Sequence, residues 1–323
     1  MPANLPPQYF EAEKNFRAAK TPEEKIAALE DMLAIMPKHK GTDHLRAELR
    51  SRIAKLTDMA AKKGGAQRSS MMIEREGAAQ VAVVGMPNAG KSQLVASLTN
   101  ASPVVAEYPF TTYAASPGMM EFENIQIQLI DTPPLVPQFI EWWLPPILRR
   151  ADGLVIMVDA AGSPSEQMEA VIEQLVKMRI GIGVEEAAEG IIIRQKVLVV
   201  GNKIDLDGAR KNYEALQSRY KDQLPFMAIS AKEGTGLEEL KRKIYQLLNI
   251  IRVYTKVPGK KPDFNDPIIL DEGSTMADAA TSVHKDFRAR LKYARLWGSG
   301  KHDGIMVKRD HVVQDGDIIE LHM

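Results

Sequence analysis

The chain has 323 residues, and its 42 basic residues balance its 42 acidic ones, so net charge excludes no class of partner and only local clusters can indicate one. It has no cysteine, which excludes disulfides and thiolate metal sites. There is no early apolar run and no apolar stretch of about 18 residues, so we expect a cytoplasmic chain with no signal peptide and no membrane partner.

Residues 1–76 are predicted to form a helical N-terminal region. Thr21-Pro22-Glu23-Glu24 is a capping box with proline at the first helical position. Apolar residues then recur at helical spacing in two stretches: Ile26, Leu29, Leu33 and Met36, followed by Leu45, Leu49, Ile53 and Leu56. We therefore predict a helical hairpin. Segment 38–75 holds ten basic and four acidic residues, which fits either an RNA-facing surface or a solvated helix face.

A glycine-rich loop with the pattern G-x-x-x-x-G-K-[ST] lies between the apolar run 81–84 and a helix-like stretch at 94–98. In this context the pattern predicts a phosphate-binding loop, because glycine lets successive N–H groups point at a phosphate and the helix start favours negative charge. Its lysine can reach the β- and γ-phosphates and its serine can bind Mg²⁺. The loop residues are Gly85, Met86, Pro87, Asn88, Ala89, Gly90, Lys91 and Ser92.

Short apolar runs and helical patterns alternate over residues 77–249, which predicts an α/β domain with a mostly parallel sheet and helices on both faces. The expected strands include Ile125–Ile130, Leu154–Val158, Val197–Val200 and Phe226–Ile229. Ligands of such sheets bind beyond the carboxyl ends of the strands. Polar motifs that follow these runs are therefore candidate ligand residues.

Two of these motifs indicate a guanine nucleotide, GTP or GDP. Asn202-Lys203-Ile204-Asp205 follows a strand, and the Asp205 carboxylate can accept from both N1–H and the 2-amino group of guanine. Adenine lacks this donor pair, so a buried unpaired carboxylate would disfavour ATP. Asn202 would brace the loop and the Lys203 stem would pack along the base. Ser230-Ala231-Lys232 follows the next strand and can offer backbone N–H to guanine O6.

Two further segments are candidates for switches that respond to the nucleotide. Phe110-Thr111-Thr112 lies in a polar stretch, where a threonine can close onto Mg²⁺ and the γ-phosphate. Asp131-Thr132-Pro133-Pro134 follows a strand, and Asp131 can hold a water bound to Mg²⁺.

These motifs together resemble translation-factor-class GTPases of the Obg/DRG group, the developmentally regulated GTP-binding proteins. The tail from Ile250 to Met323 is similar to the TGS domain, a small β-grasp module, through Arg252–Lys256, Lys260–Phe264, His284–Asp286 and Leu296–Gly298. The resemblance implies a P-loop GTPase domain over 77–249, a TGS domain over 250–323, and Thr112 as the Mg²⁺ ligand beside Ser92 and Asp131. It also implies association with ribosomes or structured RNA that GTP controls.

The chain departs from the family pattern at two places. Pro134 replaces the glycine of the D-x-x-G motif and has no N–H for the γ-phosphate. Residues 178–196 are too few for the inserted domain of DRG proteins, and we expect there only a loop with one short strand, Ile191–Ile193. Leu135 stands where many small GTPases have a water-orienting glutamine, as in other GTPases with a hydrophobic residue at this position. For hydrolysis this leaves Lys91, Thr112 and Asn88. Asn88 either binds K⁺ beside the phosphates or simply tolerates a tight turn.

The last part of the chain carries a basic cluster. Residues 285–309 hold eight basic residues and two acidic ones, with Tyr293 and Trp297 between them, which favours an RNA surface over a protein partner of the TGS domain without excluding the latter. Thr275 can cap a helix to about His284, and a final strand follows Asp315-Gly316-Asp317. Trp142 and Trp143 fit core packing better than an exposed anchor for a partner.

Two functions from different classes follow from these motifs. The first is a GTP-binding protein with slow Mg²⁺-dependent hydrolysis, weakened by Pro134 and Leu135, that acts on ribosomes or structured RNA in translation or ribosome assembly. The alternative is a nucleotide-gated scaffold that binds RNA or protein and has negligible hydrolysis.

Overall fold

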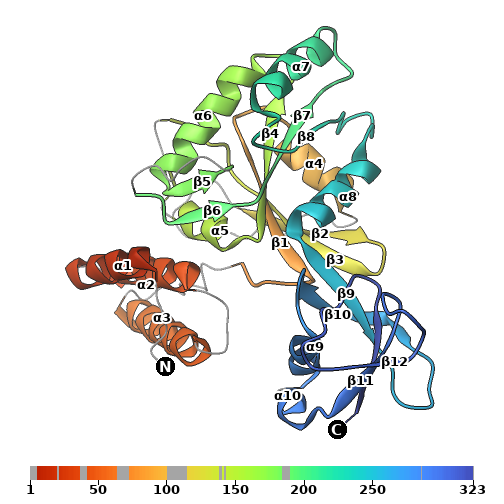
Figure 1. Cartoon of the computed structure of the whole chain (residues 1–323). Helices are drawn as coiled ribbons and strands as arrows, with labels where there is room; N and C mark the ends of the chain where they lie inside the picture. The colour runs from red at the N-terminus through yellow and green to blue at the C-terminus, as the bar shows by residue number, and fades with distance from the viewer. Residues whose placement is uncertain are drawn as a thin grey trace. The chain divides into compact units, whose positions relative to one another are not determined.

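The computed structural model describes residues 6–19, 22–36, 42–63, 73–99, 115–137, 140–141, 143–183, 190–284 and 286–322. The chain divides into two compact units (Figure 1). One comprises Met1–Met119 and Gln128–Leu237, and the other comprises Met120–Ile127 and Glu238–Met323. Among the described residues, no helix has the length and apolar character that a membrane crossing requires.

The described residues of the N-terminal part form three helices: α1 (Pro7–Ala18), α2 (Pro22–Ile35) and α3 (Asp43–Lys63). Helices α2 and α3 are the predicted hairpin, and α1 is an additional helix that packs with them. Tyr9 and Ala12 of α1 join Leu29 and Met36 in one small core. The Arg46 guanidinium donates to the carbonyl of Met36 at 2.8 Å and so closes the open end of α2.

The central sheet has six strands in the order β2-β3-β1-β4-β7-β8. The strands are β1 (Ala79–Gly85), β2 (Ser116–Phe122), β3 (Ile125–Asp131), β4 (Gly153–Asp159), β7 (Val197–Asn202) and β8 (Phe226–Ala228). Strands β1, β4, β7 and β8 pair in parallel, with Gly85 beside Met157 and Asp159 beside Asn202. Their carboxyl ends therefore meet at one edge, as the sequence predicted.

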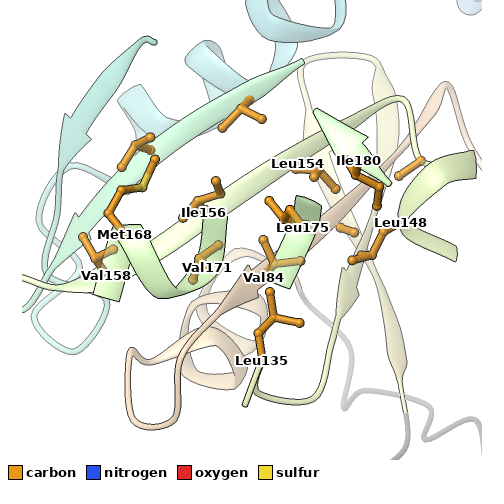
Figure 2. Packing of buried hydrophobic residues seen from close by; sticks show 14 of the residues in the cluster. Val84, Leu135, Leu148, Leu154, Ile156, Val158, Met168, Val171, Leu175 and Ile180 are labelled. Atoms are coloured by element: carbon orange, nitrogen blue, oxygen red, sulfur yellow. The ribbon is translucent and has the colours of Figure 1, made fainter. Parts of the chain in front are cut away.

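Helices lie on both faces of this sheet, with α4 (Lys91–Leu98) on one side and α5 (Leu144–Arg150) and α6 (Pro164–Lys177) on the other, while α7 (Ala209–Tyr220) joins β7 to β8 (Figure 1). Figure 2 shows the core between α6 and the sheet, where Ile156, Val171 and Leu175 pack together. Trp143 is buried in the same core, so the core interpretation holds for it, whereas Trp142 lies outside the described residues. The two prolines after Leu144 occupy the first turn of α5, where no N–H is needed.

The segment expected to hold one short strand contains two. β5 (Ile180–Ile182) and β6 (Ile193–Gln195) form a separate parallel ladder. The predicted strand at 191–193 is therefore two residues too early, and only Ile193 of it lies in the paired stretch. Strand β5 was missed, since Gly181 disfavours a strand by local propensity alone.

The second unit contains α8 (Leu237–Leu248) from Glu238 onward and a five-stranded sheet in the order β10-β9-β13-β11-β12. Its further elements are β9 (Ile250–Thr255), β10 (Asp263–Asp271), α9 (Met276–Val283), α10 (Phe287–Arg290), β11 (Tyr293–Trp297), β12 (Ile305–Val307) and β13 (Ile318–His322). Thr275 caps α9 in a reciprocal capping box with Asp278, as predicted. Strand β13 is the predicted final strand and runs parallel to β9, in the manner of a β-grasp fold.

The tip of the β2–β3 hairpin belongs to the second unit. Asn124 donates to the Tyr254 hydroxyl at 2.9 Å, and Arg252 forms an ion pair with Glu123. The rings of Phe122 and Tyr245 stack with centroids 4.9 Å apart. These contacts explain why residues 120–127 group with 238–323 rather than with the rest of their own strands.

Candidate nucleotide-binding site

The glycine-rich loop connects β1 to α4 at the edge where the parallel strands end. A Cβ on Gly85 would collide with the carbonyl oxygen of Met157, so the loop begins where only glycine fits. Gly90 has a φ of +95°, and a Cβ there would collide with the side-chain amide of Asn202. Close approach to the neighbouring strands thus explains why both fixed positions of the motif are glycine.

Lys91 is buried at the base of this loop, with 7% of the residue exposed. Its ammonium donates to the carbonyls of Gly85 and Met86, each at 3.2 Å. Burial lowers the pKa of Lys91, and the nearby carboxylate of Asp131 opposes that shift. Conversely, burial raises the pKa of Asp131, while a hydrogen bond from Ser92 and the charge of Lys91 lower it. The charges of Lys91 and Asp131 therefore influence each other beside the glycine-rich loop.

Asp131 is the last residue of β3, and the environment of one of its carboxylate oxygens is unusual. Its Oδ1 is buried and has no hydrogen-bond partner among the described residues. Buried carboxylate oxygens are normally satisfied, so an orphaned one next to a phosphate-binding loop fits a water or a hydrated cation. Within the described residues, no cluster of three or more His, Cys, Asp or Glu side chains could hold a metal by itself.

The segment after Asp131 is fastened to β1. The Thr132 hydroxyl donates to the carbonyl of Val83 at 2.7 Å, and the N–H of Leu135 donates to the carbonyl of Gly85 at 3.0 Å. Leu135 is only 2% exposed, and Figure 2 shows it beside Val84. The residue at the usual glutamine position is thus a core residue, and Pro134 lies between two anchored positions.

Asn202 joins the phosphate end of the site to the other predicted motifs. It is 3% exposed, and its Nδ2 donates to the carbonyl of Ala89 at 2.9 Å. Its Oδ1 accepts from the N–H of Ala231, also at 2.9 Å. One buried amide therefore sets the distance between residues 85–92 and 230–232.

The remaining base-reading candidates lie close to Asn202. Lys203 adopts a left-handed φ of +64°, and its ammonium is 2.5 Å from Oδ2 of Asp159. A hydrogen bond from the Ser230 hydroxyl holds the pKa of Asp205 below its usual value. Lys232 is exposed and ion-paired with Glu233 at 3.5 Å. Asp159 was not predicted, although it follows a buried strand in the same way as the predicted residues.

Other predicted residues divide into two groups. Pro87 and Asn88 are exposed on the glycine-rich loop, and Asn88 has a left-handed φ of +63°, which agrees with its role in a tight turn. Phe110, Thr111 and Thr112 lie outside the described residues. The described residues therefore bring together the phosphate loop, Asp131, 202–205 and 230–232.

Comparison with known proteins identifies two matching families along the chain. Residues 80–203 match the family described as 50S ribosome-binding GTPase, and residues 251–323 match the TGS domain. An uncharacterized GTP-binding protein of Methanocaldococcus jannaschii is 32% identical, with 93% of this chain and 92% of the relative covered. The developmentally regulated GTP-binding protein 2 homolog of Dictyostelium discoideum is 28% identical, and ribosome-interacting GTPase 1 of Saccharomyces cerevisiae is 25% identical. Each of these two alignments covers 92% of this chain and 98% of the relative. The chain therefore belongs to the developmentally regulated family of GTP-binding proteins, in which a GTPase domain is followed by a TGS domain.

Proposed function

We propose that the chain binds GTP and GDP at residues 85–92, 131, 202–205 and 230–232, hydrolyses GTP slowly with Mg²⁺, and acts on ribosomes or structured RNA. The observation that carries the nucleotide assignment is the Asn202 amide, which bonds both Ala89 and Ala231. A single side chain thereby spaces a phosphate site from a base site, which a nucleotide requires and a simple anion does not.

In this proposal Asp205 reads guanine. A carboxyl with a pKa at or below the usual aspartate value is ionised at neutral pH, so Asp205 can accept from N1–H and the 2-amino group. The aliphatic stem of Lys203 packs along the base. Within 230–232 the N–H of Lys232 donates to O6, because the N–H groups of Ser230 and Ala231 already donate to Thr235 and Asn202. Adenine would leave the Asp205 carboxylate without its donor pair, which disfavours ATP.

The phosphates lie against Gly85–Ser92, with Lys91 at the β- and γ-phosphates. The orphaned Oδ1 of Asp131 and the nearby Ser92 hydroxyl fit a hydrated Mg²⁺. When bound, Mg²⁺ neutralises charge on the phosphate oxygens. The roles of Thr112 in holding Mg²⁺, of Phe110 and Thr111 in closing the site, and of Asn88 in binding K⁺ rest on the family resemblance.

A second candidate is a nucleotide-gated scaffold without significant hydrolysis. It is favoured by Leu135, which is buried and offers no group that could orient water. Phosphate release from purified protein with Mg²⁺, in K⁺ and in Na⁺ buffer, separates the two candidates. A slow GTP-dependent release supports the GTPase, with acceleration by K⁺ supporting a role for Asn88. Release no faster than from Lys91→Ala protein supports the scaffold.

Support for an RNA partner comes mainly from the second unit. In the N-terminal cluster, Arg52 pairs with Glu48 and Arg75 with Asp152, and Arg46 caps α2, so several basic side chains have internal partners there. The cluster after α9 is more available. Arg288 pairs with Asp278, but five further residues are exposed around α10, β11 and β12, namely Arg290, Lys292, Arg295, Lys301 and Lys308.

The open face of the second sheet adds aromatic groups to these charges. Ala294 and Leu296 of β11 point into the core, so Tyr293, Arg295 and Trp297 point to the other face. The Lys256 ammonium lies 4.3 Å from the Trp297 ring centroid. Aromatic rings interleaved with cations suit stacked bases and phosphates. The competing interpretation of this surface is a site for a protein partner of the TGS domain. A ribosomal partner would place the protein in the cytoplasm.

Sedimentation with ribosomal subunits tests the partner, with GDP or a non-hydrolysable GTP analogue present. The triple change of Arg290, Lys292 and Arg295 to alanine should weaken binding and flatten its salt dependence, because fewer counterions are released. The matched control replaces three exposed basic residues near α7, Arg210, Lys211 and Lys221. Binding that is absent, or equally reduced by both triple changes, contradicts this surface. Binding that survives ribonuclease treatment of the partner fraction indicates a protein instead.

A further inference from the structure

Asp159 lies beside the proposed base site and has no role in the function described above. It is the last residue of β4 and pairs with Asn202 in the parallel register. Asn202 is the residue immediately before Lys203. Oδ2 of Asp159 is 2.5 Å from the Lys203 ammonium, and Oδ1 accepts from the N–H of Ala161 at 2.9 Å. The backbone of its own loop therefore orients the carboxylate, and the second oxygen faces a single lysine.

Side chains of two helices fix the loop that carries Asp159. The Gln167 amide of α6 accepts from the N–H of Asp159 at 2.9 Å and donates to its carbonyl at 3.3 Å. The Asn212 amide of α7 donates to the carbonyl of Ala160 at 3.1 Å, and the N–H of Ala160 donates to the carbonyl of Asn202 at 3.0 Å. The carboxylate thus has a defined position relative to β7 and to the residue that follows it.

Lys203 gains the most from such a fixed partner. A lysine side chain has four rotatable bonds and loses much freedom when it is ordered. Its backbone is held by the left-handed φ of +64°, but only the Asp159 contact fixes its far end among the interactions of the described residues. With both ends held, the stem follows one path across the region where the base would lie.

We propose that Asp159 is a positioning residue of the guanine site, which holds the Lys203 ammonium so that the lysine stem is in place before the nucleotide binds. This rests on the proposed GTP function and assigns the positioning of Lys203 to a residue outside the nucleotide-binding motifs. An exposed ion pair of equal length, Arg219 with Glu169 at 2.5 Å, gives a reference for a contact with no such role.

Equilibrium titration of GDP against four proteins tests the proposal: the parent, Asp159→Asn, Lys203→Met and the double variant. The asparagine keeps an acceptor for Ala161 but loses the charge, so GDP affinity should fall about three- to tenfold. Lys203→Met should weaken GDP binding at least as much, and the double variant should match Lys203→Met within about twofold. The control Glu169→Gln should bind GDP like the parent.

Two further readouts separate positioning from damage to the loop. Binding of inorganic triphosphate and the melting temperature of the nucleotide-free protein should change little in Asp159→Asn, because neither depends on the base. The proposal is overturned if Asp159→Asn lowers GDP affinity by the same factor in the parent and in Lys203→Met. It is also overturned if Asp159→Asn binds GDP like the parent while Lys203→Met binds it more weakly. An unchanged affinity of Lys203→Met also overturns the proposal, whereas a parent protein that does not bind GDP would refute the proposed nucleotide site itself.

Discussion

Replacing Asn202 by alanine removes the connection between the two halves of the proposed nucleotide site. The change deletes two buried hydrogen bonds of 2.9 Å and leaves the Ala89 carbonyl and the Ala231 N–H without that partner. Leaving a buried polar group unsatisfied costs about 1–3 kcal/mol. Part of that cost is relieved if the loops move or water enters, so we expect the free energy of unfolding to fall by roughly 2–4 kcal/mol.

Differential scanning calorimetry of the nucleotide-free protein measures this loss of stability as a lower melting temperature. For a folded unit of roughly 150–250 residues, 1 kcal/mol corresponds to about 2–4 °C of melting temperature, so the transition should shift down by roughly 4–16 °C. Affinity for GDP should also fall, by about tenfold, because the nucleotide must then order both loops itself. The matched control is Gln93→Ala, an exposed amide on α4 with one 3.3 Å hydrogen bond to Ser97. A melting temperature of Asn202→Ala within the range of that control would refute the reasoning.

Three further predictions concern single residues. Asp205→Asn should lose GTP affinity and gain affinity for XTP, because an amide can donate to the second carbonyl of xanthine; titration with GTP, ATP and XTP checks this, and no gain for XTP contradicts it. Pro134→Gly restores an N–H and should raise the ratio of GTP-analogue affinity to GDP affinity by at most about tenfold to a hundredfold. Calorimetric titration of both nucleotides measures this ratio, and an unchanged ratio would show that the missing donor is irrelevant. Burial raises the pKa of Glu30 to about 7, with Arg150 opposing, from about 4.5 in the unfolded chain. Its contribution to stability is therefore full at low pH and lost as pH rises to about 7, by up to roughly 3 kcal/mol. Glu30→Gln should flatten the fall of melting temperature over that interval, and a parallel pH profile would exclude Glu30 as its source.

The parts of the fold that follow from short-range patterns were predictable. The glycine-rich loop, the buried strands β3, β4, β7 and β8, and the capped helix α9 each have a local chemical reason. Strand β2 was not predicted, because Pro117 and Gly118 disfavour a strand and its position at the sheet edge is a tertiary property. Helix α1 lies in the region predicted to be helical but was not assigned as a separate helix, because its apolar residues are few and are stabilised by packing on α2.

The site shows the same division between local and tertiary information. Residues in motifs, such as Lys91 and Asp205, could be named from spacing alone. The partners of those residues could not, since the contact between Lys203 and Asp159 joins positions 44 residues apart on neighbouring strands. The burial of Leu135 likewise depends on how the loop after β3 returns to β1.

The β2–β3 tip limits how this chain can be divided or recombined. A fragment that begins at α8 would carry Arg252 and Tyr254 without Glu123 and Asn124, and Tyr245 without the ring of Phe122. A chimera that exchanges only the C-terminal residues between two relatives would pair one parent's TGS domain with the other parent's hairpin. Compatible exchange therefore requires residues 120–127 to travel with 238–323, so the unit that can be inherited or transplanted as one piece is discontinuous in sequence.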